Sequence, residues 1–261
     1  NNMEIFNYFS LELNLFFVIL VLSITIFAGI IKGIVGFAMP LIMVTGFATF
    51  LPLDLAIVAM IIPTLVTNFH QAFRDGINPA IIPLKKYWKY LLILCLTVLI
   101  SSQLMPIIPD QTLFLAMGFP IFGFTLLQIL KIRLKIFNGN QTITELVFGF
   151  FAGFFGGLAG TWGPPTVSFF LTQNLGRKLQ LRSQGIIYFF GSITFIIGYT
   201  NTQLFTLTSL TFSIILLVPA ILGVTIGNRL SRTMDSKRYI ILTQILLLLA
   251  SINLIRRGLG Y

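Results

Sequence analysis

A glycine- and proline-containing segment that occurs twice is the part of this sequence best suited to bind a ligand. Residues 27–40 and 151–164 are identical at six of fourteen positions, namely Phe, Ala, three Gly and the final Pro. The copies lie 124 residues apart, and each interrupts a strongly apolar stretch. Interrupted apolar segments at matching places in two halves are typical of the substrate site of a membrane transporter.

The second copy is suited to binding an anion without a charged side chain. Glycine lets the backbone bend and approach a ligand closely, and proline favours the first turn of the helix that follows. A loop that ends at a helix start presents free N–H groups and the positive end of the helix dipole. The Thr161 hydroxyl is a further candidate donor. The alternative is close helix packing, because glycine is common where membrane helices touch.

Lys32 is the only basic residue inside either copy of the motif. A charge at membrane depth is rare and usually functional, so Lys32 is a candidate partner for an anionic substrate. The alternative is snorkelling, since Lys32 lies roughly 27 Å along a straight helix from the start of its segment, near the membrane surface.

A polar patch late in the third apolar segment consists of Asn68, His70 and Gln71. In the repeat, Asn68 corresponds to Ser192 and Thr64 corresponds to Tyr188. We expect these pairs either to line a cavity or to join helix to helix. For His70 an interfacial position is favoured over a proton relay.

The composition indicates a polytopic membrane protein. Of 261 residues, 56% are apolar and only 9% are charged, against about 25% charged in a soluble domain. The net charge of +10 comes from lysines and arginines in short loops between apolar segments, which argues against nucleic acid as a partner. The single cysteine, Cys95, excludes an internal disulfide and gives no metal-site spacing.

Ten apolar segments are expected to be helices, because backbone groups cannot stay unpaired in lipid. They span residues 14–32, 38–50, 54–72, 88–106, 111–130, 142–160, 164–175, 184–200, 207–228 and 239–255. The segments 38–50 and 164–175 are too short for the about 20 residues that a crossing needs. Each follows a glycine-rich segment, so we expect a broken helical hairpin at the start of each half.

The basic residues predict the orientation. Four clusters fall on one side of a ten-segment topology: Arg74, Lys85, Lys86 and Lys89; Lys131, Arg133 and Lys135; Arg177, Lys178 and Arg182; and Arg229, Arg232, Lys237 and Arg238. The positive-inside rule puts these clusters in the cytoplasm of a prokaryotic-type plasma membrane, with the N-terminus outside. Arg256 and Arg257 break the pattern. Each half would hold five segments, so residues 1–137 and 138–261 would form inverted repeats.

Several chemistries lack support. None of the seven acidic residues lies in the middle of an apolar segment, so no carboxylate proton site is evident. We find no nucleophile–base pair, metal cluster or nucleotide loop, so neither an enzyme, a metal nor a cofactor is expected.

At the repeated motifs the chain resembles the TauE/SafE family of sulfite and organosulfonate exporters. The resemblance rests on Lys32-Gly33, Gly36-Phe37 and Pro40, on the glycines between Gly149 and Gly163 with Pro164, and on Gly227-Asn228-Arg229-Leu230. It covers nearly the whole chain and implies transport of small sulfur-containing anions. The chain departs from the family pattern at Phe37, Ala38 and Met39, where small residues are common, and at Trp162.

These observations predict an all-helical inverted-repeat carrier of a small sulfur-containing anion such as sulfite, thiosulfate or a sulfonate. The alternatives are a passive anion channel, a carrier of a small carboxylate, and a structural or receptor protein. The expected partners are the anion and the lipid bilayer, and a homo-oligomer is compatible with the sequence. The candidate substrate-binding residues are Lys32, Gly33, Gly36, Phe37, Pro40, Asn68, Gly157, Gly160, Thr161, Trp162, Gly163, Pro164, Tyr188 and Ser192.

Overall fold

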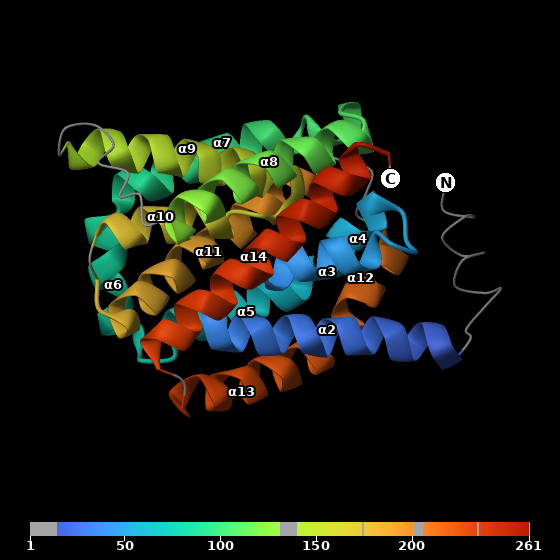
Figure 1. The fold of residues 1–261 in the computed structure, drawn as a ribbon, viewed down its shortest axis with the longest axis horizontal. Coiled ribbons are helices and arrows are strands. Elements are labelled where there is room, and N and C mark those ends of the chain that lie inside the picture. Colours follow the sequence, from blue (N-terminus) through green and yellow to red (C-terminus); the bar gives the residue numbers. More distant parts are fainter. Residues whose placement is uncertain (1–14, 131–139, 174, 201–205, 234, 261) are drawn as a thin grey trace.

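The computed structural model describes residues 15–130, 140–173, 175–200, 206–233 and 235–260, and in these ranges every regular element is a helix (Figure 1). Up to residue 130 the helices are α2 (Leu15–Val35), α3 (Met39–Phe47), α4 (Leu53–Ala59), α5 (Ile61–Phe73), α6 (Ile77–Lys86), α7 (Trp88–Ser102), η1 (Met105–Ile107) and α8 (Asp110–Ile129). From residue 140 they are α9 (Gln141–Ala159), α10 (Gly163–Thr172), α11 (Arg177–Thr200), α12 (Leu207–Ile215), α13 (Leu217–Thr233) and α14 (Ser236–Gly258).

Helices cover all ten of the predicted apolar ranges, and six helical stretches are long and apolar enough to cross a membrane. The protein is therefore an all-helical, multi-pass membrane protein, and the count of ten membrane segments stays a prediction. The polar connection between α5 and α7 contains one further helix, α6. This helix exposes Ile77, Ile81 and Ile82 beside its two lysines, as an amphipathic interfacial helix does. The basic cluster at residues 131–135 lies outside the described residues.

The predicted helix over 54–72 is broken into α4 and α5 at Met60. Pro63 has no N–H group and cannot donate to the carbonyl of Ala59 four residues earlier. Ser213 of α12 donates its hydroxyl to that free carbonyl at 3.0 Å and accepts the N–H of Ile62 at 3.0 Å. The break is thus stabilised by a partner from the other end of the chain.

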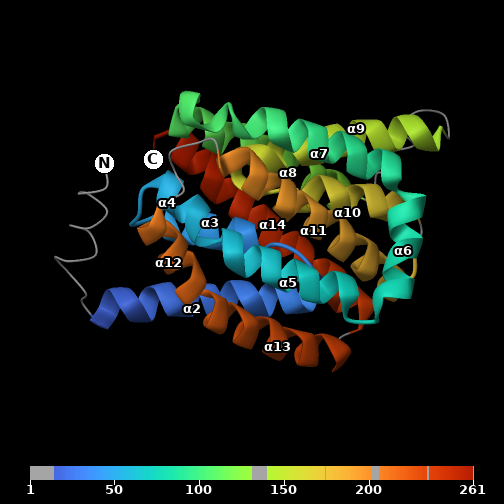
Figure 2. The ribbon, with the colours of Figure 1, turned by 180° about the vertical axis from the view of Figure 1, so that it is seen from behind.

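Glycines bring helices from distant parts of the chain into close contact. Gly29 and Gly33 of α2 face Gly223 and Gly227 of α13, with no room for a Cβ on either side. On α9, Gly149, Gly153 and Gly157 pack in the same way against the backbone of α7. Such small-residue seams let membrane helices approach closely. The α2–α13 and α7–α9 pairs form opposite sides of the molecule, with α5 and α11 between them (Figures 1 and 2).

Helix ends that carry basic clusters gather at one end of the bundle. The helix α6, the start of α11, the end of α13 and the start of α14 lie at the left in Figure 1, whereas α2 begins and α14 ends at the right. Arg257, which broke the charge pattern, lies at that right-hand end. Its guanidinium donates to the carbonyl of Ala48, the C-cap of α3, and its centre is 4.8 Å from the centroid of the Phe114 ring. A specific capping role therefore explains this arginine.

Candidate substrate site

The two glycine–proline segments form two helix breaks that meet inside the molecule. The first lies between α2 and α3, and the second lies between α9 and α10. Gly36 (φ 83°) and Gly160 (φ 67°) occupy corresponding positions of the repeat, and both adopt the left-handed conformation that glycine tolerates best. The ring of Phe37 from the first break lies against Gly163 of the second, where an added Cβ would be 2.8 Å away.

The helices that follow the breaks both start at this meeting point. Pro40 and Pro164 lie in the first turns of α3 and α10, and neither helix start is capped by a side chain. Ala38, the residue before α3, has φ 75°, a strained conformation that costs on the order of 1 kcal/mol for a non-glycine residue. The first break therefore holds backbone strain, and two uncapped helix N-termini converge on one place.

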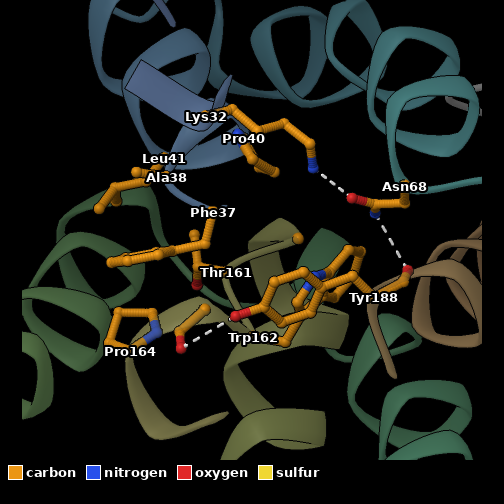
Figure 3. A pocket seen from close by; sticks show the side chains of 12 residues that line it. Lys32, Phe37, Ala38, Pro40, Leu41, Asn68, Thr161, Trp162, Pro164 and Tyr188 are labelled. Carbon is orange, nitrogen blue, oxygen red and sulfur yellow. Dashed lines mark hydrogen bonds between the residues drawn. The ribbon is translucent and has the colours of Figure 1, made fainter. Parts of the chain in front are cut away.

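These elements enclose a small cavity (Figure 3). Its walls are Lys32, Phe37, Ala38, Pro40, Leu41, Asn68, Gly160, Thr161, Trp162, Gly163, Pro164 and Tyr188. The enclosed volume is about 10 Å³, which is room for a single water molecule. The cavity is therefore too small for an oxyanion as it stands, and a larger ligand requires the surrounding side chains or helices to move.

Lys32 supplies the only positive charge in the wall of this cavity. It is 3% exposed, and its ammonium donates a hydrogen bond to Oδ1 of Asn68 and lies 6.0 Å from the centroid of the Tyr188 ring. No Asp or Glu lines the cavity, and within the described ranges no carboxylate forms an ion pair with Lys32. A buried ammonium with neutral partners alone is costly, so this place favours an anion.

Asn68 is held in one orientation by α11. Its Nδ2 donates to the hydroxyl of Ser192 at 2.8 Å and to the carbonyl of Tyr188 at 3.1 Å. Because both amide protons are used there, Oδ1 is left to face Lys32, as Figure 3 shows. The polar patch predicted from the sequence thus both joins α5 to α11 and orients the lysine's partner.

The structure brings ten of the fourteen candidate residues into one wall: Lys32, Phe37, Pro40, Asn68, Gly160, Thr161, Trp162, Gly163, Pro164 and Tyr188. Ser192 lies behind Asn68. Gly33 and Gly36 line an adjoining chamber on the other side of Lys32. Gly157 is not brought to the cavity, because it faces Val98 and Ser101 of α7. Gly157 therefore lies at a close helix–helix contact, which was the alternative to ligand binding.

Two details of the site differ from expectation. The Thr161 hydroxyl donates to the carbonyl of Phe155 at 3.1 Å, so its single proton is already used. Sequence reasoning also missed Ala38 and Leu41 in the wall and Met60, whose side-chain end lies against Gly160. Met60 corresponds to Gln184 in the repeat, and nothing in the sequence marked either residue as part of a site.

Acidic and metal-binding groups do not gather at this cavity. Glu145, near the start of α9, is 3% exposed and accepts a hydrogen bond from Gln141 at 2.9 Å. Its burial was not evident from its place at the edge of an apolar segment. In the part of the chain that the structure describes, no group of three His, Cys, Asp or Glu side chains is positioned to hold a metal ion.

Comparison with known proteins identifies the family. The model of the sulfite exporter TauE/SafE family matches residues 21–254, nearly the whole chain, and the chain therefore belongs to this family. Comparisons with curated proteins and with solved structures gave no match.

Proposed function

We propose that this TauE/SafE family member carries a small sulfur-containing anion, such as sulfite, thiosulfate or a sulfonate, by alternating access around the small cavity. The observation that carries this proposal is Lys32, a buried lysine side chain with no carboxylate partner among the described residues. An anion in the cavity would supply the missing negative charge.

The donors around the cavity suit a compact anion with several oxygens. Lys32 would donate to the anion from one side, with Asn68 held beside it. The uncapped starts of α3 and α10 would add their N–H groups and dipoles from the two helix breaks. Phe37 and Trp162 would limit the size of the ligand. A sulfur oxyanion fits this arrangement because its oxygens point in several directions at once.

Alternating access requires two halves that can rock about the site, and we infer inverted repeats of residues 1–137 and 138–261. Support comes from reciprocal packing: α2 packs on α13, while its repeat counterpart α9 packs on α7. The glycines at the two breaks have the same left-handed conformation. The end of the bundle with the basic clusters would face the cytoplasm, with the N-terminus outside.

The small size of the cavity favours a carrier over a passive channel, because an open channel needs a continuous path wide enough for the anion. The test is counterflow of radiolabelled sulfite into proteoliposomes preloaded with unlabelled sulfite, with thiosulfate, sulfoacetate and a carboxylate as competitors. A carrier gives uptake above that of empty liposomes, and the order of competitors gives the substrate class. Uptake that is blocked best by the carboxylate would reject the sulfur-anion assignment. Conductance far above carrier turnover without counterflow would indicate a channel.

A further inference from the structure

A second polar chamber lies on the other side of Lys32 from the cavity. It encloses about 20 Å³ and is lined by Lys32, Gly33, Gly36, Thr67, His70, Gln71, Arg74, Leu181, Val224 and Asn228. These residues come from the ends of α2 and α5, the start of α11 and from α13. The chamber thus lies toward the end of the bundle that carries the basic clusters, and no acidic residue lines it.

The mouth of this chamber is open and positively charged. His70 and Arg74 are exposed, and both also border a groove of about 370 Å³ between α5 and α13. The nearest carboxylate in sequence, Asp75, is engaged by Arg182 at 2.6 Å and leaves Arg74 without an ion pair in the described chain. The chamber is therefore lined by a basic residue at the surface, Arg74, and by a buried one, Lys32.

Next to Gly36, behind the lining of the chamber, lies a buried amide without a partner. Gln184 of α11 is fully buried, and neither its Oε1 nor its Nε2 makes a hydrogen bond. Its Oε1 lies against Gly36. A Cβ added to Gly36 would be 3.1 Å from this oxygen and 3.3 Å from Nε2 of Gln71. An unsatisfied buried amide costs about 1–3 kcal/mol, so Gln184 is a candidate hydrogen-bond partner for a ligand in the chamber.

The corresponding place in the other half has no charged residue, because the counterparts of Lys32 and Arg74 are Gly156 and Gly198. In the repeat, with its offset of 124 residues, Gly156 corresponds to Lys32 and Met60 corresponds to Gln184. Met60 lies against Gly160 just as Gln184 lies against Gly36. The indole of Trp162, whose counterpart is Ala38, lies 2.9 Å from an added Cβ at Gly156 and fills the space. Of these two corresponding places, the one near the basic clusters is therefore the one with positively charged walls.

We propose that this chamber, with Arg74 and Lys32 in its wall and Gln184 next to it, is a second binding site for a small sulfonate- or sulfite-like oxyanion. It would take up the anion at the basic end, and Lys32, shared by both walls, would pass it to the small cavity. The role in transport rests on the function proposed above, whereas anion binding in the chamber does not.

Anion protection of an introduced thiol tests this binding directly. In a Cys95→Ser background, Gln71→Cys puts the thiol in the chamber wall, and Gln180→Cys puts it on α11 outside the wall. Membrane vesicles of both orientations are labelled with a small methanethiosulfonate reagent at increasing concentrations of methanesulfonate. We expect methanesulfonate to slow labelling of Gln71→Cys, but not of Gln180→Cys, when presented at the basic end.

Charge variants identify the site. Adding Arg74→Gln should raise the half-protecting methanesulfonate concentration about tenfold, as expected for loss of a charge-assisted hydrogen bond. Gln184→Met, which copies the residue of the other half, should raise it in the same direction. Lys85→Gln removes an exposed charge at the same end and should leave the value unchanged.

The outcomes separate the two proposals. Equal labelling with and without methanesulfonate, or equal effects of Arg74→Gln and Lys85→Gln, would overturn the second site even if sulfite counterflow is intact. Specific protection together with absent counterflow of every anion tested would keep the second site and reject the carrier.

Discussion

Asn68 donates a hydrogen bond of 2.8 Å to Ser192, the residue 124 positions later that corresponds to it in the repeated sequence. Two residues at matching places therefore touch each other, between helices α5 and α11 in the middle of the bundle. This contact fixes the Asn68 amide so that its oxygen faces Lys32. The site thus depends on a polar link between the two parts of the chain.

The neutrality of Asn68 is the first property to test. Asn68→Asp would place a carboxylate beside the Lys32 ammonium and satisfy its charge without a substrate. We expect sulfite counterflow to fall by more than about tenfold, because the anion must then compete with a fixed ion pair. Asn68→Ser, which stays neutral, should retain more flux than Asn68→Asp. The reverse order would show that Lys32 does not act through its charge.

The two kinds of glycine should give different defects. Gly160 has φ 67° and lies in the cavity wall, so Gly160→Ala should abolish counterflow while costing only about 1 kcal/mol of stability. Gly157 lies against the backbone of α7, so Gly157→Ala should lower the thermal unfolding temperature more than Gly160→Ala does. Thermal unfolding in detergent and flux per folded protein measure both effects. Equal destabilisation by the two variants would contradict this division.

Arg257 is expected to stabilise the outer end of α3. Arg257→Gln removes the hydrogen bond to the Ala48 carbonyl and the contact with the Phe114 ring. The loss should be about 1–2 kcal/mol, seen as a lower unfolding temperature. The neighbouring Arg256 is exposed and serves as a matched control, since Arg256→Gln should change stability little. Equal shifts in both variants would indicate a general effect of charge.

The ion pair between Asp75 and Arg182 should make stability depend on pH. The hydrogen bond from Arg182, with help from nearby Lys178 and Arg74, holds the pKa of Asp75 below its usual value. A lowered folded-state pKa means that the stabilisation is present at neutral pH and is lost as pH falls through that pKa.

The difference in unfolding temperature between wild type and Asp75→Asn measures this contribution, which is at most about 1 kcal/mol for a partly exposed pair. The difference should be constant from pH 7 to about 5 and should close below about pH 4, the ordinary range of an aspartate. A difference that persists unchanged to pH 3 would refute the assignment.

The sequence predicted the helical ranges, because apolar runs in a membrane must be helical. It also predicted the two broken helices and most of the cavity wall, because glycine, proline and a lysine are unusual within an apolar segment. It did not predict which glycines line the cavity. Gly157 and Gly160 carry the same sequence signal, and only packing against α7 separates them. The break at Met60 was also missed, because the serine that stabilises it comes from 154 residues later in the chain. The burial of Gln184 likewise depends on contacts between distant segments.

The most direct test of the account is sulfite counterflow by wild type, Lys32→Arg and Lys32→Met in proteoliposomes, normalised to folded protein. We expect robust flux in the wild type, reduced flux in Lys32→Arg, which keeps the charge on a bulkier group, and none above empty liposomes in Lys32→Met. Wild-type flux in Lys32→Met would contradict the claim that this buried cation binds the transported anion.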